Sequence, residues 1–254
     1  MTEAEATTYE LGSLDRALEI LTVLSISPGL RLADLSASLG ANGTTVLRAL
    51  RVLERQGFVR RAATGYRLGA RLAELGHAAI ASLDVAAELH DTLAELGSSQ
   101  QATAHIGMYR AGMVTIVGKI EPPQPLVRYS TLGTRMPLHA TAAGKAALAV
   151  LGDDYVSSLT AAGLAPYTPS TVCEGENLMR QVAETRKRRF SIEEGEYQVG
   201  FVCVASAFRV EDELYTVSLS SPFVERRALL SRGEFLVSAL DRFLHAQLGI
   251  SPGF

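Results

Sequence analysis

Apolar residues in the N-terminal part of the chain recur with a helical period and predict three short helices. The first carries its apolar series on one face and stops at Ser27-Pro28-Gly29; the series is Leu14, Ala17, Leu18, Leu21 and Leu24. Leu32, Leu35 and Leu39 predict a second helix, which Gly40 ends as a cap able to adopt positive φ. A turn of about three residues then leads into a third helix near 44–56, which is the arrangement of a helix-turn-helix.

The third predicted helix has two unlike faces. Its apolar residues gather on one side: Val46, Ala49, Leu50 and Leu53. At a helical period, Thr44, Arg48, Arg51 and Arg55 all fall within roughly 40° of the opposite direction. The pattern predicts one face that packs and one basic face. An ordinary solvated helix face is the alternative interpretation of such a charge pattern.

After this helix the period changes to two, which predicts a β-hairpin. Residues 58–61 and 66–68 alternate on either side of Ala62-Ala63-Thr64-Gly65. A hairpin in this place is typical of a wing. We expect Thr44, Thr45 and Arg48 to enter the major groove of DNA. The wing arginines would reach backbone phosphate or a minor groove, and they are Arg60, Arg61 and Arg67.

The rest of the chain mixes helices and strands, which predicts an α+β fold with a largely antiparallel sheet. Helices are expected near 72–79 and from Val85 to Leu96, where Gly97 would end the second one. Further helices are expected at 141–151, 154–162, 175–189 and from 224 to about 248, and strands at 102–109, 113–120, 199–209 and 214–220. The predicted organisation is a DNA-binding domain at 10–69, a linker helix at 70–83 and a larger domain at 84–254.

Composition and charge sharpen this picture. The 254 residues are 47% hydrophobic with a net charge of -3, which suits two folded domains. The charge is uneven, because seven arginines and only one acidic residue, Glu54, lie between Asn42 and Arg71. Such an excess indicates a phosphate-binding surface. The acidic first residues and the lack of a long apolar run predict a cytoplasmic protein with no membrane contact. Two cysteines without metal-ligand spacing predict no metal and no cofactor.

At this point the sequence resembles the IclR family of bacterial transcription regulators along nearly its whole length. The likeness rests, in chain order, on SLDRALEIL (13–21), TTVLRAL (44–50), GYRLG (65–69), PLHATAAGKA (137–146), residues 191–205 and VSLSSP (217–222). The resemblance implies a dimer or dimer of dimers, operators read by paired winged helices, and an effector bound in a GAF-like C-terminal domain. One departure is Ala41-Asn42-Gly43, where the family commonly has a leucine and a basic or proline-containing pair. This leaves open where the third helix begins.

The resemblance also implies a set of effector contacts: Ala142, Ala143, Glu193, Cys203, Ser218 and Ser220. Each position has an ordinary alternative. The first two begin a small-residue helix whose free N–H groups suit a carboxylate, or which simply packs tightly. Ser218 and Ser220 share a strand face that suits a pocket or a solvated edge. Cys203 lies in an apolar strand typical of a core. Glu193, in an acidic run, also fits a solvated turn, and the family often has an aspartate there.

These observations predict a sequence-specific DNA-binding regulator whose operator affinity responds to a small molecule, and not an enzyme. The expected partners are a double-stranded DNA operator, an organic acid or aromatic metabolite as effector, and further copies in a homodimer or tetramer. An enzyme using His139, Cys203 and Ser218 is the main alternative, although no nucleophile elbow or metal spacing supports it. A protein-interaction module built on the winged helix is the other. We expect effector binding to change the spacing of two winged helices in a dimer.

Overall fold

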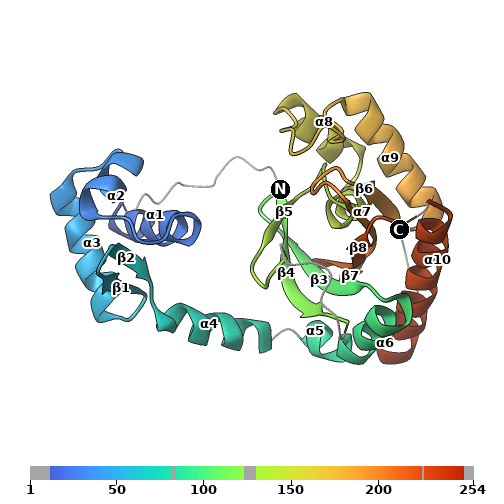
Figure 1. The fold of residues 1–254 in the computed structure, drawn as a ribbon, viewed down its shortest axis with the longest axis horizontal. Helices are drawn as coiled ribbons and strands as arrows, with labels where there is room; N and C mark the ends of the chain where they lie inside the picture. The colour runs from blue at the N-terminus through green and yellow to red at the C-terminus, as the bar shows by residue number, and fades with distance from the viewer. Residues whose placement is uncertain (1–11, 82–83, 123–129, 225, 249–254) are drawn as a thin grey trace. The chain divides into compact units, whose positions relative to one another are not determined.

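The computed structural model describes residues 12–81, 84–122, 130–224 and 226–248, and it divides the chain into two compact units, 1–82 and 83–254. The boundaries expected at residue 10 and residue 83, and the last six residues of the predicted larger domain, lie outside the described residues. Figure 1 shows the elements of each unit.

The first unit contains a three-helix winged helix-turn-helix, which α4 follows. Its elements are α1 (Gly12–Ile26), α2 (Leu32–Ser38), α3 (Gly43–Arg55), β1 (Val59–Ala62) and β2 (Gly65–Leu68). One buried cluster joins them: Ile20, Leu24, Leu35, Val46, Leu50, Leu53, Val59 and Tyr66. Gly40, just past the C-cap of α2, has a φ of +56°, which confirms the positive φ predicted there. The predicted helix-turn-helix and wing are therefore confirmed.

Helix α1 buries its predicted apolar series only in part. Leu24 is buried and Ala17 and Leu21 pack against the same core, as predicted. Leu14 and Leu18, however, are 52% and 55% exposed, and Ile20, outside the predicted series, is buried. The prediction was wrong at these positions because an apolar series on one helix leaves two adjoining faces open, and only the partner elements decide which is covered.

Helix α4 (Ala70–Ala81) follows the wing. Its side chains are exposed or half-buried throughout the described part, and none of them is fully buried. Leu75 is 43% exposed. An amphipathic helix in water normally buries its apolar stripe against another element. Within this unit the stripe of α4 therefore stays open to solvent.

The second unit is built on a six-stranded antiparallel sheet with strand order β5-β4-β3-β8-β7-β6. The strands are β3 (Thr103–Arg110), β4 (Met113–Ile120), β5 (Arg135–Pro137), β6 (Ser191–Glu194), β7 (Phe201–Val210) and β8 (Glu213–Pro222). This confirms the predicted α+β class with an antiparallel sheet. Strands β5 and β6 were not predicted. They are short, and β6 has the sequence SIEE, which resembles a polar turn when taken alone.

Helices cover the two faces of this sheet (Figure 1). On one face lie α5 (Asp84–Glu88), α6 (His90–Gln100), α10 (Arg226–Phe243) and a π-helical turn at Leu244–Leu248, packed against Ile106, Val204, Val217 and Leu219. On the other face α7 (Ala142–Leu151) packs against Val114, Ala205 and Ala207, with α8 (Asp153–Ala161) and α9 (Gly175–Arg188) beside it. Alternate residues of one strand thus enter two different cores.

Two further details complete the fold. The prediction that Gly97 ends its helix was wrong, because α6 runs on to Gln100 and the buried Gly97 lies within it. A Cβ at position 97 would lie 3.2 Å from the carbonyl oxygen of Ala102. Close packing explains this glycine better than capping does. Of the helices in the described ranges, none is both long and apolar enough to cross a membrane. Across those same ranges, no cluster of three His, Cys, Asp or Glu could hold a metal ion.

Candidate functional site

Helix α3 begins with a side-chain cap at the point where the sequence departs from the family pattern. Asn42 has an extended backbone, and its Oδ1 accepts a hydrogen bond from the Thr44 amide at 2.9 Å. Asparagine is among the preferred N-cap residues because it satisfies an amide that the helix leaves free. The helix therefore starts at Gly43, one residue before the predicted start, and Thr44 and Thr45 lie in its first turn.

The two faces of α3 are separated as the periodicity predicted. Val46, Leu50 and Leu53 are buried, whereas the polar face is exposed at every predicted position: Thr44, Thr45, Arg48, Arg51 and Arg55. None of the ion pairs found within the described residues uses these three arginines. Three unneutralised guanidinium groups on one ridge form a surface suited to an anion.

The wing adds more positive charge. Arg60 and Arg61 of β1 are exposed, and Arg67 of β2 is half-buried. Arg60 and Arg67 are directly paired across the hairpin. Like charges directly opposite each other destabilise a strand pair. An anion placed over this face would remove the repulsion, which favours a phosphate-binding role over a purely structural one.

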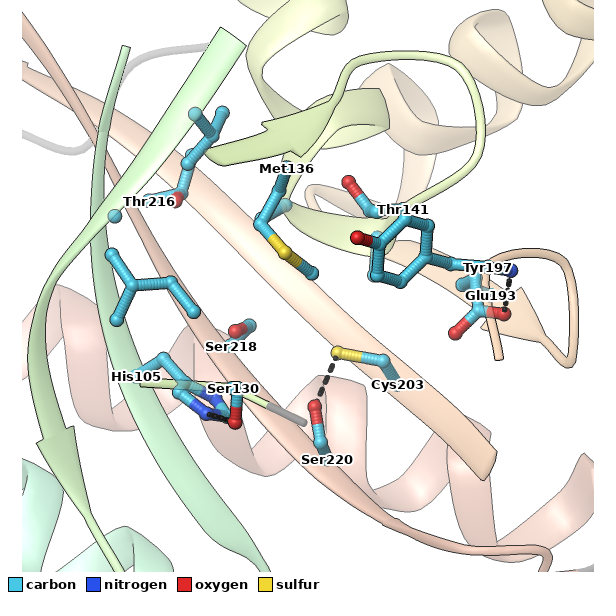
Figure 2. Close-up of a pocket in the computed structure, with 15 residues that line it drawn as sticks. His105, Ser130, Met136, Thr141, Glu193, Tyr197, Cys203, Thr216, Ser218 and Ser220 are labelled. Carbon is cyan, nitrogen blue, oxygen red and sulfur yellow. Dashed lines mark hydrogen bonds between the residues drawn. The ribbon is translucent and has the colours of Figure 1, made fainter. Parts of the chain in front are cut away.

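In the second unit, one face of the sheet forms the floor of a pocket (Figure 2). The floor crosses the sheet through directly paired residues: Glu193 with Cys203, Cys203 with Ser220, Ser218 with His105, and Thr216 with Gly107. Directly paired residues point to the same face of a sheet. The floor therefore contains residues from four strands, of which β3 is distant in sequence from the other three.

All six residues expected from the resemblance to contact an effector line this pocket, so the structure brings them together. They are joined by nine lining residues that sequence reasoning missed: His105, Gly107, Val114, Ile116, Ser130, Met136, Thr141, Tyr197 and Thr216. The space that admits the centre of a water molecule is about 30 Å³. A water needs about 10–15 Å³ by this measure. The pocket is thus narrow, and a ligand with a ring would have to displace side chains.

The start of α7 forms one wall of the pocket. Thr141 is the N-cap, and its Oγ1 accepts from the Gly144 amide at 3.0 Å. The amides of Ala142 and Ala143 have no acceptor within the described part of the chain, as expected for a first helical turn. Tight packing is carried by Gly144, since a Cβ there would lie 2.4 Å from Leu138 Cα. In this small-residue segment, Ala142 and Ala143 thus offer free amides, while the neighbouring Gly144 allows tight packing.

Glu193 is the acidic group of the pocket. It lies in β6 and is only 4% exposed, so the alternative of a solvated turn is wrong. Its Oε1 accepts from the amides of Glu196 and Tyr197. Burial raises the pKa of Glu193 to about 7, and these two amides and the nearby Lys145 offset only part of that effect. Near neutral pH this carboxyl is therefore divided between its protonated and ionised forms.

Replacing Glu193 by Gln is expected to change how stability depends on pH. Between the ordinary pKa of 4.5 and the folded value of about 7, the folded protein holds a proton that the unfolded chain has lost. The free energy of unfolding of the wild type should therefore fall as pH rises through this window, by up to about 3 kcal/mol relative to Glu193→Gln. Urea unfolding of both proteins at about pH 5 and about pH 8 measures it. A constant difference between the two proteins would contradict the expectation.

The other titratable groups of the pocket are uncharged at neutral pH. Burial, and next the charge of Lys119, lower the pKa of His105 to about 3. The His105 Nε2 and the Ser130 Oγ are hydrogen-bonded at 2.8 Å. Burial raises the pKa of Cys203 to about 12, and this thiol accepts from the Ser220 hydroxyl at 3.1 Å. A protonated thiol is a poor nucleophile, so the pocket suits binding rather than covalent chemistry.

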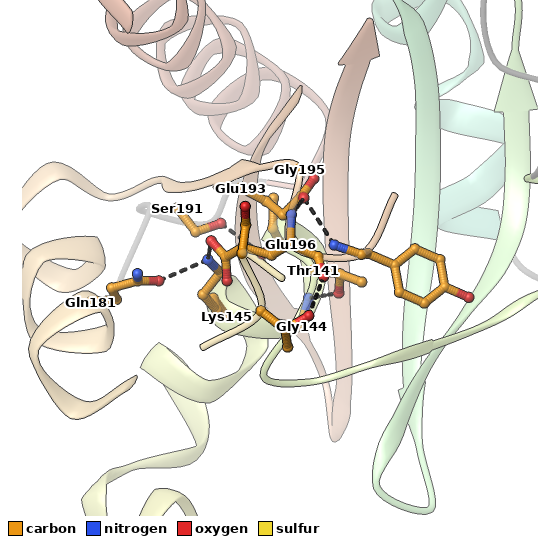
Figure 3. Close-up of polar contacts among 12 residues, drawn as sticks. Thr141, Gly144, Lys145, Gln181, Ser191, Glu193, Gly195 and Glu196 are labelled. Atoms are coloured by element: carbon orange, nitrogen blue, oxygen red, sulfur yellow. Dashed lines mark hydrogen bonds and ion pairs between the residues drawn. The ribbon is translucent and has the colours of Figure 1, made fainter. Parts of the chain in front are cut away.

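Beneath the pocket wall lies a buried ionic cluster around Lys145 (Figure 3). The side chain of Lys145 is fully buried; its Nζ is 2.5 Å from Glu196 Oε1 and 2.7 Å from Gln181 Oε1. Glu196 is also held through its carbonyl oxygen, which accepts from the Thr171 hydroxyl at 2.6 Å. The cluster fixes the turn after β6, whose amides bind Glu193.

Comparison with known proteins gives a family match for each of the two units. Residues 13–63 match the family model of the IclR helix-turn-helix domain, and residues 77–237 match that of the bacterial transcriptional regulator IclR C-terminal domain. The chain is 32% identical over 197 residues to the HTH-type transcriptional regulator XynR of Escherichia coli K12, covering 76% of this chain and 78% of that protein.

Solved structures agree with these matches. The crystal structure of an IclR transcriptional regulator from Alicyclobacillus acidocaldarius has a TM-score of 0.81 at 26% identity, covering 92% of this chain and 98% of that one. An IclR homologue from Microbacterium hydrocarbonoxydans, crystallised with 4-hydroxybenzoate, has a TM-score of 0.76 at 18% identity, covering 92% and 100%. The second likeness concerns the fold alone.

Proposed function

This chain belongs to the IclR family of bacterial transcription regulators, and from that premise we propose which of its residues read DNA and which bind the effector. It is a DNA-binding regulator with a C-terminal effector-binding domain, not an enzyme. The assignment of individual residues rests chiefly on one observation: the exposed ridge of α3 carries three arginines without ion-pair partners beside a wing with opposed arginines.

For DNA, α3 enters the major groove with its first turn foremost. Thr44, Thr45 and Arg48 then face base edges, which hydroxyl and guanidinium groups read by hydrogen bonds. Arg51 and Arg55, farther along the same ridge, contact phosphates. Arg60, Arg61 and Arg67 of the wing contact the backbone or the minor groove beside it. The Asn42 cap supports this arrangement, since it sets the helix start and thereby the position of both threonines.

Removal of one wing arginine tests the phosphate role. Arg60→Ala is expected to reduce the dependence of log affinity on log salt by about 0.9, because each phosphate contact releases condensed counterions. Fluorescence anisotropy with a duplex that the wild-type protein has selected from a random library, at about 50–200 mM salt, measures the slope. Arg209→Ala is the matched control, an exposed arginine on β7 of the other unit. Equal slopes for all three proteins would remove Arg60 from the interface.

For the effector, the pocket between α7 and the sheet is the binding site. Ala142 and Ala143 offer free amides, while Glu193, Cys203, Ser218 and Ser220 offer hydrogen-bonding side chains on the floor. This chemistry suits an organic acid or an aromatic metabolite with a carboxylate at the start of α7. The 4-hydroxybenzoate seen in the Microbacterium homologue is a ligand of this class. Met136, which lies over the floor in Figure 2, is flexible enough to move aside for a ring.

We expect the active form to be a homodimer, or a tetramer made of two such dimers. The open apolar stripe of α4 and the exposed Leu14 and Leu18 of α1 are surfaces that a second copy would cover. The effector would then act on the distance between two winged helices, because paired half-sites on DNA have a fixed spacing.

Two measurements test this function together. Light scattering gives the mass of the protein in solution, and anisotropy gives operator affinity with and without a carboxylic acid that raises the melting temperature. An acid that binds the protein should shift operator affinity by roughly 5–150-fold, the usual range of allosteric coupling. Binding of the acid with unchanged operator affinity would contradict the regulatory role of the pocket.

A further inference from the structure

Thr216 presents a buried hydroxyl that no group among the described residues satisfies. The residue is 1% exposed, it lines the pocket from the middle of β8, and its Oγ1 has no hydrogen-bond partner among the described residues. Buried polar groups are nearly always hydrogen-bonded, so an exception asks for an explanation. The resemblance to the family assigned Ser218 and Ser220 on this strand, but nothing assigned Thr216.

The neighbouring residue is a glycine, so no side chain from that position packs against this hydroxyl. Gly107 of β3 is the direct partner of Thr216 and also lines the pocket. A Cβ at position 107 would lie 2.5 Å from Thr216 Oγ1 and 2.4 Å from Val114 Cγ1. Any other residue at 107 would thus fill the space beside the hydroxyl. The strand register also shifts between Ile106 and Gly107, as in a β-bulge, a feature that often re-aims side chains near functional sites.

A second hydrogen-bonding group lies two residues along the same floor. His105 is 4% exposed and stands opposite Ser218, next to the Gly107–Thr216 pair. Its Nε2 is hydrogen-bonded to the Ser130 Oγ, which leaves the Nδ1 of the ring as the atom that could bind a ligand. An uncharged imidazole of this kind hydrogen-bonds a neutral group without demanding a countercharge.

We propose that Thr216, assisted by His105, forms a second polar end of the pocket that binds a hydroxyl group of the effector. The effector is then a carboxylic acid with a hydroxyl at the end remote from its carboxylate. This inference rests on the proposed role of the pocket as the effector site, and it deepens that role by assigning residues for ligand selection.

The geometry of the floor explains why the hydroxyl must be remote. The acidic end of the floor, Glu193, lies on β6, and Thr216 lies on β8, with β7 between them. Glu193 is level with Ser220 on β8 through Cys203, and Thr216 lies four residues farther along β8. The separation therefore combines about 10 Å across the strands with about 13 Å along the strand. In Figure 2 Thr216 and His105 lie on the opposite side of Met136 from Glu193. A ligand held at the α7 amides therefore needs the length of a ring or an extended chain to reach Thr216.

The test compares acids that differ only in the hydroxyl. Calorimetric titration of the full chain uses 4-hydroxybenzoate against benzoate, 2-hydroxybenzoate as the near-hydroxyl isomer, and 5-hydroxypentanoate against pentanoate. Wild type should bind the remote-hydroxyl acid of at least one pair about tenfold more tightly than its parent acid. Thr216→Val should abolish this preference, so that it binds the two acids of the pair with equal affinity. Thr216→Ser, which keeps the hydroxyl, should retain it.

Thr103→Val is the matched control. Thr103 is also fully buried in the sheet, and its Oγ1 likewise lacks a partner among the described residues, but Thr103 does not line the pocket. This variant should keep the full preference for the hydroxyl acid. Thermal melts of both valine variants verify that each is folded. A loss of preference shared by Thr103→Val and Thr216→Val would overturn the proposal, because it would reflect the sheet rather than a contact.

The remaining outcomes separate this inference from the proposed function. If wild type binds hydroxylated and parent acids equally, the assignment of Thr216 is overturned while the pocket remains an effector site. Preference for 2-hydroxybenzoate over its 4-hydroxy isomer overturns it as well. If none of the five acids binds, although the protein still binds DNA, then both this inference and the carboxylic-acid effector are wrong.

Discussion

Replacing both Arg48 and Arg51 by alanine is expected to lower the affinity for the selected operator by roughly 100-fold. Arg48, about one turn into α3, is the arginine proposed to face base edges, and Arg51 follows on the same exposed ridge. A bidentate arginine–base pair contributes about 1–3 kcal/mol, and each phosphate contact adds to this. The helix itself should survive, since alanine has the highest helix propensity and neither arginine packs in the core.

Anisotropy with operator and with random duplex measures this prediction. Arg48→Ala alone should also reduce the ratio of operator affinity to random-duplex affinity. Arg51→Ala alone should lower both affinities in similar proportion. Arg209→Ala again serves as the control for loss of one exposed positive charge. Undiminished operator binding by the double variant would exclude the α3 ridge from the interface. If Arg209→Ala lowered operator affinity as much as the double variant does, net charge alone would explain the loss.

Replacing Lys145 by Met is expected to lower the free energy of unfolding of the second unit by about 3–5 kcal/mol. Lys145 is fully buried, and its ammonium group is the close partner of Glu196. Removal of one partner leaves the other charge buried without compensation. Glu196 already has one carboxylate oxygen, Oε2, with no hydrogen bond among the described residues. The variant therefore loses the main interaction that offsets the burial of this group.

Urea unfolding followed by circular dichroism checks the Lys145 prediction. The control is Lys187→Met, an exposed lysine near the end of α9, whose cost should stay within about 0.5 kcal/mol. A double variant, Lys145→Met with Glu196→Leu, should be more stable than Lys145→Met alone, because replacing both partners removes the unpaired charge. Equal stability of Lys145→Met and wild type would mean that the pair contributes no net stabilisation.

Local patterns were sufficient to predict the first unit. The two faces of α3 follow from the helical period alone, because each residue's direction depends on its neighbours within a few turns. The wing follows in the same way from a change to period two and a glycine-containing turn. The failure at Leu14 and Leu18 marks the limit of this reasoning. Which apolar stripe is buried depends on where α2 and α3 lie, and that is not local information.

The pocket shows the same limit more strongly. Ser218 and Ser220 could be placed on one strand face from their spacing, and Thr216 lies two residues earlier on that face. His105 could not be added, since it meets Ser218 only because β3 pairs with β8. The acidic run at residues 193–196 suggested a turn exposed to solvent. Glu193 and Glu196 are nevertheless buried. Glu196 is paired with Lys145, about fifty positions earlier in the chain, and no local pattern carries that relation.

The central place of β8 in the sheet bears on the order in which the protein is made. Residue 103 pairs with residue 220, so the middle of the sheet closes only after β8 has been synthesised. Domains generally fold as units, and N-terminal ones first, during translation. The winged helix can therefore form on the ribosome while the pocket is still incomplete. A nascent or prematurely terminated chain would therefore contain a folded DNA-binding unit without a complete effector-binding domain.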